Sequence, residues 1–495
     1  MVLPALSGLL IAAAFRDFSR YALAWVAFAP LLWGLAEAKT RREAAWIGAI
    51  AGMATNVPAF TWLVYTIHVF GGFPYPIAAL FYLGLSVFAA CQFVLFALAL
   101  RRTGPGPLGL AAPVMWVALE FLYPNLFPWR LANSQFHVPL LTQVGDLTGP
   151  FGLSFVLVWF SAALALVARR PRRLLPLGAA TAAVVTLLAY SAVRIPSVER
   201  AIAAAPRVRV ALIQGNIGIR EKGDAAAFEH NVERYRALSE MLQSDVDLVI
   251  WPESVAQWWV PAEAERLQSG LQPFPGLRTH LIFGGLAYSV DAEGRPKLFN
   301  SAFLIDGEGA VLGRYDKRVL LPFGEYLPGS SWIPGLAKLS PQSGNFTPGH
   351  ALRTLDVPGR ARFAPLVCYE DVPSGGARAM TRQGAEVLLT MFNDAWFGAS
   401  AAPYQHEALA LWRAIENRRY FVRVGNAGAT GVIDPLGRVV SRLGLFTEGT
   451  LTVEIRPLRI ETFYTRFGDV FGWSVAAAAA LWLLWGRRRR RSVAT

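Results

Sequence analysis

Apolar residues are distributed in two distinct ways along this chain of 495 residues. Nearly continuous apolar segments fill residues 1–193 and recur at 471–486, whereas 207–465 mixes polar and apolar positions as a globular domain does. This pattern predicts a helical membrane domain (1–193), a polar domain (194–470), and a final helix with a basic tail (471–495). The composition agrees, because a chain that is 54% hydrophobic and 16% charged is too apolar for an ordinary soluble protein.

Eight apolar segments are candidates for membrane helices. Seven precede the polar domain and one follows it, at about 2–15, 21–36, 44–66, 76–100, 106–122, 151–168, 174–192 and 471–486. Several are shorter than the roughly 20 residues that a perpendicular helix needs. Between the fifth and sixth segments lies Trp129, which we interpret either as an interfacial anchor or as part of a route for a lipid chain.

The charges of the connecting loops predict the orientation of these helices. The net charge is +13, and basic residues cluster at the ends of apolar segments, at 39–42, 101–102, 169–173 and 487–491. Cytoplasmic loops carry such an excess of Lys and Arg, so all four clusters are expected inside. The opposite loops of the first seven helices carry only Arg16, Arg20 and Arg130. The polar domain is therefore predicted outside the cytoplasm, and we attribute the basic charge to topology rather than to nucleic-acid binding.

The polar domain shows strands that alternate with helices. Short apolar runs predict strands at 207–213, 247–251, 280–285, 361–367, 386–391 and 429–433, and helical periodicity appears at 226–243 and 403–419. Such alternation indicates an α/β domain. The loop 327–349 is rich in Pro, Gly and Ser and has two open interpretations, a lid or membrane contact and a packed surface loop.

Three residues of this domain suggest acyl transfer through a thioester. Cys368 follows the strand-like run Ala364–Val367, Glu253 lies in Trp251-Pro252-Glu253, and Lys317 lies in Tyr315-Asp316-Lys317. A thiolate is the nucleophilic form of cysteine, a carboxylate can take its proton, and an ammonium can stabilise the resulting anions. Each residue alone has an ordinary structural interpretation, so the argument depends on their combination. The other cysteine, Cys91, lies in an apolar run and is interpreted as a small buried or lipid-facing side chain.

These segments resemble the Glu-Lys-Cys motifs of the nitrilase (carbon–nitrogen hydrolase) superfamily. Within it, the chain as a whole resembles the apolipoprotein N-acyltransferase family, which has seven helices, an extracytoplasmic nitrilase-like domain and a final helix. Further matching segments are Gln214-Gly215-Asn216, Pro322-Phe323-Gly324-Glu325, Asn393 to Gly398, and Asn426-Ala427-Gly428.

The resemblance implies a multi-pass membrane domain of the bacterial inner membrane and a periplasmic α-β-β-α sandwich. It implies that Cys368 takes an acyl chain from a phospholipid, phosphatidylethanolamine at its sn-1 position, and passes it to the α-amine of an S-diacylglyceryl cysteine on an apolipoprotein. A thioester passes its acyl group to an amine spontaneously, so no cofactor is expected. The six histidines show no metal-like spacing, so no metal is expected either.

The family also implies supporting or substrate-binding roles for Glu325, Tyr369, Glu370 and Trp396. Glu325 is expected to position Lys317 or Glu253. One departure concerns the Lys-Trp pair that the family often has after Gln-Gly-Asn, because Lys222 is followed here by Gly223. Any role of that tryptophan must be absent here or supplied elsewhere, for which Trp258 and Trp259 are candidates.

Two other functions fit parts of the sequence. A membrane-anchored amidase would use the same triad with water as acceptor, although an ordinary amidase needs no eight-helix platform. A transporter with an outer binding domain is disfavoured, because the apolar segments contain few ionisable groups besides Glu120 and show no obvious repeat.

Overall fold

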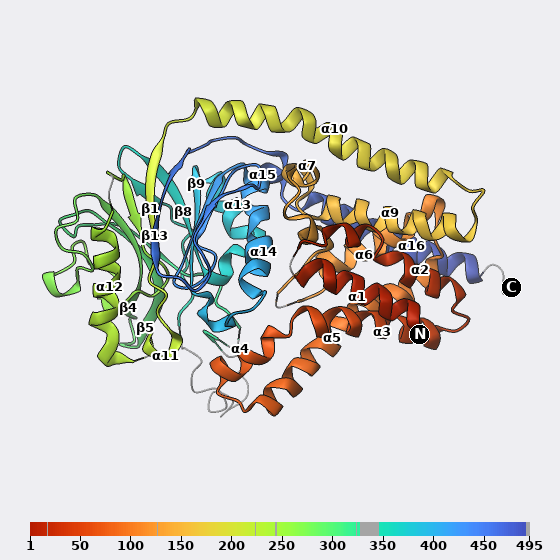
Figure 1. Cartoon of the computed structure of the whole chain (residues 1–495), viewed down its shortest axis with the longest axis horizontal. Helices are drawn as coiled ribbons and strands as arrows, with labels where there is room; N and C mark the ends of the chain where they lie inside the picture. The colour runs from red at the N-terminus through yellow and green to blue at the C-terminus, as the bar shows by residue number, and fades with distance from the viewer. Residues whose placement is uncertain are drawn as a thin grey trace. The chain divides into compact units, whose positions relative to one another are not determined.

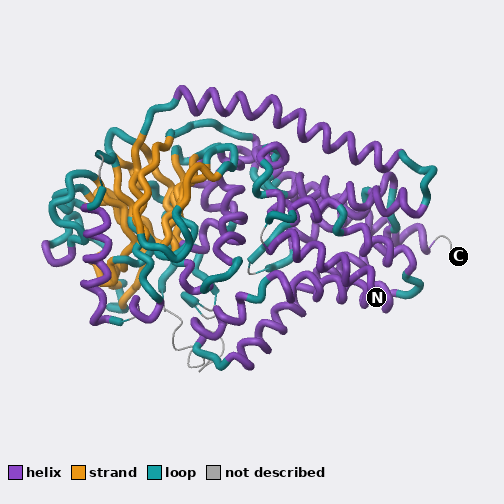
Figure 2. Tube along the Cα trace, viewed as in Figure 1, coloured by secondary structure: helices purple, strands orange, loops and turns teal. Residues whose placement is uncertain are grey.

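The computed structural model describes the chain except residues 17, 126, 223, 243–244, 323, 327–345 and 492–495. The chain forms two compact units. One comprises Met1–His68, Phe73–Ser197 and Arg466–Thr495, and the other comprises Val69–Gly72 and Val198–Thr465. The strands are confined to the second unit (Figure 2). Most of the loop predicted at 327–349 lies outside the described residues.

The first unit is built from apolar helices. Its longer elements are α1 (Val2–Arg16), α2 (Phe28–Glu37), α3 (Arg41–Ala59), α4 (Trp62–Gly71), α5 (Tyr75–Thr103), α6 (Ala111–Leu122), α9 (Phe151–Arg169), α10 (Leu175–Ala204) and α16 (Val470–Arg491). Single turns connect them, namely η1 (Tyr21–Trp25), η2 (Pro107–Gly109), η3 (Leu131–Gln135), α7 (Pro139–Thr142) and α8 (Gly145–Thr148).

Each predicted apolar segment contains a helix, but several differ from the prediction. Within the described residues, three helices are long and apolar enough to cross a membrane, or four if the bent pair α3 and α4 counts as one span. That pair, predicted as one segment at 44–66, bends by 63°, and Pro58 lies next to the break, where it weakens helical hydrogen bonding. Helix α10 continues past the predicted residue 192 to Ala204, because helix formation does not require apolar side chains.

Small residues and aromatic rings pack the helical unit. A Cβ atom at Gly52 of α3 would lie 2.7 Å from the Cα of Ala90 on α5, so glycine is what lets these helices approach closely. Trp129 is only 7% exposed and makes an edge contact with Phe15 at 5.0 Å between ring centroids. Trp129 therefore packs inside the helical unit, and the two roles suggested for it by the sequence stay predictions.

The second unit contains two sheets. A seven-stranded sheet has the order β13-β1-β2-β4-β5-β6, with β3 paired to β4, and a six-stranded sheet has the order β12-β11-β10-β9-β8-β7. The strands of the first sheet are β1 (Val208–Gln214), β2 (Leu248–Ile250), β3 (Ala256–Pro261), β4 (His280–Val290), β5 (Pro296–Ile305), β6 (Val311–Asp316) and β13 (Gly449–Ile455). Those of the second are β7 (Leu355–Val357), β8 (Ala361–Val367), β9 (Val387–Phe392), β10 (Tyr420–Gly425), β11 (Gly431–Ile433) and β12 (Val439–Arg442).

The two sheets face each other, and helices cover their outer faces (Figure 1). Helix α12 (Phe228–Glu240) packs on the seven-stranded sheet, while α13 (Ser374–Arg382) and α14 (Ala402–Asn417) pack on the other. The core between α12 and its sheet includes Tyr235 and Trp251, which are buried and pack ring against ring at 5.5 Å. This arrangement is the α-β-β-α sandwich that the sequence predicted.

All six predicted strands are present, and the two predicted helices correspond to α12 and α14. The missed strands have identifiable reasons. β10 contains Arg423 at its centre, and β5 contains Asn300 and Ser301, so neither reads as an apolar run. Asn300 and Arg423 make polar contacts inside the domain, as described below.

Candidate active site

The three residues predicted to carry the chemistry each follow the end of a strand. Glu253 comes three residues after β2, Lys317 directly follows β6, and Cys368 directly follows β8. The first two belong to the seven-stranded sheet and the third to the six-stranded sheet. Because the sheets face each other, loops from both can meet at one place.

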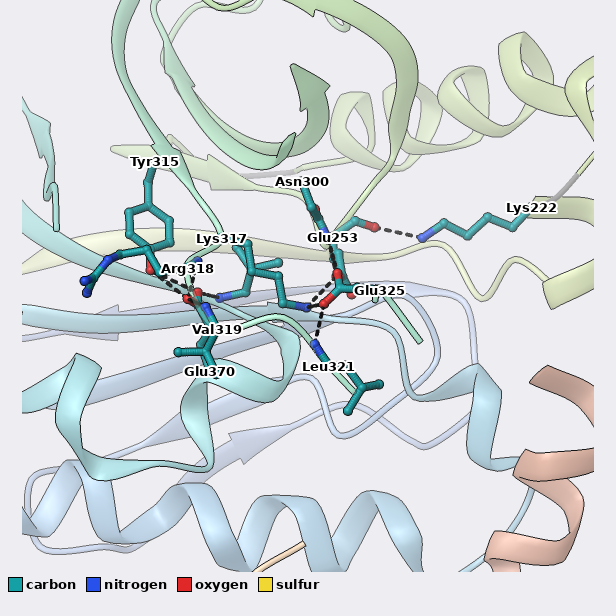
Figure 3. Close-up of polar contacts among 11 residues, drawn as sticks. Lys222, Glu253, Asn300, Tyr315, Lys317, Arg318, Val319, Leu321, Glu325 and Glu370 are labelled. Atoms are coloured by element: carbon teal, nitrogen blue, oxygen red, sulfur yellow. Dashed lines mark hydrogen bonds and ion pairs between the residues drawn. The ribbon is translucent and has the colours of Figure 1, made fainter. Parts of the chain in front are cut away.

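Lys317 is the centre of the polar cluster drawn in Figure 3. Its Nζ atom lies 2.8 Å from Glu325 Oε2 and 3.7 Å from Glu253 Oε1. The Lys317 side chain is 1% exposed, and those of Glu253 and Glu325 are 12% and 13% exposed. The structure thus brings Glu325, expected to support the triad, into direct contact with Lys317.

Sequence reasoning missed Asn300, which joins the two carboxylates. Its Nδ2 atom donates to Glu253 Oε1 at 2.8 Å and to Glu325 Oε1 at 3.1 Å, and its main-chain oxygen accepts from the Lys317 N–H at 2.8 Å. The available signal was the polar pair Asn300-Ser301 between the apolar residues Phe299 and Ala302. A buried amide in a strand needs partners, so it marks a polar site.

Close backbone packing holds the turn that carries Glu253. Gly284 of β4 lies directly under it, since a Cβ atom there would be 2.5 Å from the Pro252 oxygen and 2.6 Å from the Glu253 Cα. Ser254 has a φ of +50°, a left-handed conformation that non-glycine residues seldom adopt. On the other side, Lys222 Nζ donates to the Glu253 main-chain oxygen at 2.8 Å.

Cys368 occupies a strained position at the start of a single turn, Cys368–Asp371. Its φ is +53°, which costs on the order of 1–2 kcal/mol for a residue with a Cβ atom. Burial raises the pKa of the Cys368 thiol well above its usual value, and the Glu253 charge raises it further, against the opposing effect of Lys317. The resting residue is therefore a thiol, and its attack requires a base.

Lys317 is the permanent cation of the cluster. Burial alone would lower the pKa of its ammonium, but the carboxylates of Glu325 and Glu253 outweigh burial and raise it. An ammonium that never loses its proton at physiological pH cannot serve as the base. It suits stabilisation of an anion, and a carboxylate such as that of Glu253 is the kind of group that can accept a thiol proton.

Glu370 connects two segments of the site. One is the turn Cys368–Asp371, called the nucleophile turn after the predicted role of Cys368, and the other is residues 317–319, called the lysine loop. The Oε1 atom of Glu370 accepts from the N–H groups of Arg318 (2.7 Å) and Val319 (3.0 Å), and its Oε2 atom accepts from the Val367 N–H (2.9 Å). Tyr315 Oη donates to both oxygens, at 2.9 and 3.0 Å. Burial raises the pKa of Glu370, and the three N–H groups partly counteract it. These contacts link the two segments, and a supporting role of Glu370 in the reaction stays a prediction.

Tyr369 and Trp396, the other two residues expected to support the site, have different surroundings. Tyr369 is half-buried beside Cys368, and burial raises the pKa of its phenol. Trp396 lies in the turn Asp394–Phe397 and makes an edge contact with Phe70 at 4.8 Å between ring centroids. Trp258, one candidate to replace the family tryptophan, packs against the core and donates to the Leu271 oxygen, while Trp259 is 39% exposed.

The remaining family-like segments join the two sheets. Asn426 Nδ2 donates to the Ile217 oxygen at 2.7 Å and to Asn393 Oδ1 at 3.1 Å, and its Oδ1 atom accepts from the Ile217 N–H at 2.9 Å. The Asn216 N–H donates to the Asn426 oxygen at 2.7 Å. These amides are therefore structural, and they align the strand ends that carry the site.

A second buried network lies next to the nucleophile turn. The imidazole of His406 contacts Asp371 Oδ1 at 2.8 Å and Asp394 Oδ1 at 3.1 Å, and Arg423 Nη1 donates to Asp371 Oδ2 at 2.8 Å. Although burial lowers the pKa of His406, the two carboxylates raise it to about 9. Across the described ranges, no group of three or more His, Cys, Asp or Glu side chains could hold a metal ion.

Comparisons with known proteins match both parts of the chain. The carbon–nitrogen hydrolase family model matches residues 209–464, and the model for the N-terminal domain of apolipoprotein N-acyltransferase matches residues 7–163. A solved nitrilase-superfamily protein from Saccharomyces cerevisiae is 21% identical, with a TM-score of 0.38, over 53% of this chain and 95% of its own.

Curated relatives match along nearly the whole length. The apolipoprotein N-acyltransferase of Geobacter metallireducens is 36% identical over 96% of this chain and 93% of its own. That of Azotobacter vinelandii is 34% identical over 98% of this chain and 94% of its own. The chain therefore belongs to the apolipoprotein N-acyltransferase family.

Proposed function

We propose that this protein transfers an acyl chain from a phospholipid to the N-terminal S-diacylglyceryl cysteine of apolipoproteins through a thioester on Cys368. The observation that carries the proposal is the meeting of two carboxylates on one buried ammonium, with the half-buried, strained Cys368 close enough to interact with their charges. The names of the relatives support N-acylation of lipoproteins as the activity. The apolar helices support a lipid as acyl donor, and we take phosphatidylethanolamine, at its sn-1 ester, as the donor.

In the first step, Glu253 takes the thiol proton as the Cys368 sulfur attacks the ester carbonyl carbon. Lys317 stabilises the negative charge on the carbonyl oxygen, with the Tyr369 N–H as the second donor. The carbon–oxygen ester bond then breaks, and Glu253 returns the proton to the leaving lysophospholipid oxygen. The acyl chain remains on sulfur.

In the second step, the free α-amine of the acceptor attacks the thioester carbonyl carbon. Glu253 takes the amine proton, the carbon–sulfur bond breaks, and the sulfur regains a proton. The product is an amide, which is more stable than the thioester, so no cofactor is required.

The loop charges support the location that we propose. Basic clusters at 39–42, 101–102, 169–173 and 487–491 belong on the cytoplasmic side. The polar unit between α10 and α16 then faces the periplasm of a bacterial inner membrane, where lipoprotein acceptors become accessible.

The thioester itself tests the proposal. The purified protein is incubated with phosphatidylethanolamine without acceptor, and its intact mass is measured. We expect one acyl adduct in the parent protein and in Cys91→Ala, the matched control at the other cysteine, but none in Cys368→Ala. Adding a diacylglyceryl peptide should move the acyl chain to the peptide amine. No adduct, or an adduct that persists in Cys368→Ala, would overturn the proposal, and release only as free fatty acid would indicate the membrane-anchored amidase.

A further inference from the structure

Lys222 is a second ammonium at the site, and the triad does not include it. It ends the short helix α11 (Ile219–Lys222), and its Nζ atom contacts the Glu253 main-chain oxygen at 2.8 Å, as Figure 3 shows. Among the residues that the structure describes, no carboxylate forms an ion pair with it. The charge of Lys222 is therefore not neutralised by an ion pair and acts on the groups around it.

Lys222 lines a small cavity that has both polar and apolar walls. Asn231, Tyr235, Ser254 and Gln257 line it on the polar side, and Val255 is among its apolar residues. Asn231 is 3% exposed, and its Oδ1 atom has no hydrogen-bond partner within the described part of the chain. An ammonium has three N–H donors, so Lys222 retains donors that suit an acceptor in this cavity.

The charges around Cys368 do not balance without Lys222. Glu253 and Glu325 contribute two negative charges, and Lys317 contributes one positive charge. The reaction moves one negative charge from Glu253 to sulfur and then to the carbonyl oxygen, but does not remove it. Lys222 interacts electrostatically with both Glu253 and Cys368, so it is placed to neutralise this excess charge throughout the step.

We propose that Lys222 is a positioning residue of the acyl-transfer site, which holds the Glu253 turn through its carbonyl and balances the excess negative charge of the buried cluster. The proposal rests on the function proposed above, in which Cys368 carries the acyl chain. It explains how a turn with a left-handed Ser254 keeps one geometry, because the ammonium fixes the carbonyl immediately before that residue.

The charge of Lys222 is sensitive to pH. Burial lowers the pKa of Lys222 to about 8, although the charges of Glu253 and Cys368 raise it in part. Tyr235 lines the same cavity as Lys222, and burial keeps its phenol neutral. Glu221, the residue before Lys222 in α11, pairs with Arg234 at 3.6 Å. Loss of the Lys222 proton should therefore slow acylation above about pH 8.

Three substitutions separate the charge of Lys222 from its hydrogen bond. Lys222→Arg keeps both, Lys222→Gln keeps a donor without charge, and Lys222→Met keeps neither. The rate of acyl-adduct formation on Cys368 is measured in a single turnover between pH 6 and 9. At pH 7 we expect Lys222→Gln and Lys222→Met to acylate roughly 10-fold to 100-fold more slowly than the parent protein, since hydrogen bonds to charged groups have effects of this size. We expect Lys222→Arg to stay within about 5-fold of the parent rate and to lose the decline above pH 8.

Alkylation of the Cys368 thiol by iodoacetamide provides a readout that needs no phospholipid. The Cys368 thiol should be alkylated more slowly at pH 8 in Lys222→Gln and Lys222→Met, because these variants remove a positive charge that favours the thiolate. Lys297→Met, at another lysine of the same unit, serves as the control and should match the parent protein. The role of Lys222 would be overturned if all variants acylated and were alkylated at equal rates, or if the rates of Lys222→Gln equalled those of Lys222→Arg. If the parent protein forms no acyl adduct, while the two neutral variants are still alkylated more slowly than Lys222→Arg, the proposed function is overturned instead.

Discussion

Glu370→Gln tests whether the carboxylate between the nucleophile turn and the lysine loop holds the site together. Each Glu370 oxygen accepts at least one main-chain N–H, so an amide cannot satisfy both sides. If its NH₂ group replaces Oε2, it faces the Val367 N–H, and if it replaces Oε1, it faces those of Arg318 and Val319. The better orientation still leaves one buried N–H without an acceptor.

The expected loss of stability follows from this count. A buried donor without a partner costs about 1–3 kcal/mol, and the remaining hydrogen bonds lose the strength that a charged acceptor gives them. The neutral amide is easier to bury than the carboxylate, which offsets part of the loss. We expect a net destabilisation of about 2 kcal/mol, which lowers the melting temperature by about 4–8 °C for a domain of this size.

Acylation should fall together with stability. The N–H groups of Arg318 and Val319 directly follow Lys317, so a loosened loop displaces the ammonium from the reacting carbonyl. We expect an approximately tenfold slower acyl-adduct formation, since small displacements in a site have effects of this order. Thermal unfolding followed by tryptophan fluorescence and single-turnover mass spectrometry measure the two effects.

The control is Glu308→Gln, at a glutamate whose side chain is 83% exposed and which should change neither quantity. The reasoning would be refuted if Glu370→Gln matched that control in both assays. A change in melting temperature with unchanged acylation would show that Glu370 stabilises the fold without positioning Lys317.

Three further predictions concern the same domain. Gly284→Ala should slow acylation at least tenfold, because its Cβ would overlap the backbone of the Glu253 turn at 2.5 Å, whereas Gly270→Ala, which has open space, should not. Glu253→Gln should speed alkylation of the Cys368 thiol while it abolishes acylation, since the Glu253 charge raises the thiol pKa; slower alkylation would contradict this. The pKa of His406 is raised to about 9 from an ordinary value near 6.5, so its contribution to stability is complete below pH 6.5 and is lost as the pH rises through 9. The melting temperature should therefore fall between pH 6.5 and 9 in the parent protein but not in His406→Gln, and parallel pH curves would refute the assignment.

The apolar runs of the central strands predicted an α/β domain, and the family resemblance implied its α-β-β-α arrangement. β8 and β9, for example, are buried along almost their whole length and read as strands without further information. Two of the missed strands, β5 and β10, carry polar side chains whose partners lie far away in the sequence. Arg423 in β10 pairs with Asp371, which lies 52 residues earlier, and no local pattern reveals such a pairing.

The same reason explains which site residues were predicted. Glu253, Lys317 and Cys368 could be found because each lies in a short segment with a distinctive local composition. Asn300 could not, because its importance comes from touching Glu253 and Glu325 at once, 47 and 25 residues away. Lys222 appeared in the sequence only as a departure from a family pattern, and its contact with the Glu253 carbonyl became apparent only in three dimensions.

The buried charges of the site form one electrostatic unit, and this limits what single substitutions can show. Lys317 keeps its proton at 1% exposure only because Glu325 and Glu253 outweigh the effect of burial on its pKa. Removing either carboxylate therefore changes the lysine as well as the carboxylate itself, and Asn300 transmits the change to the other acid. Effects of groups that act as a unit are not additive, so a double substitution of Glu253 and Glu325 should cost far less than the two single losses combined. The role of each residue is thus a property of the cluster that the two sheets bring together, which is why strand ends far apart in the sequence must be positioned so closely.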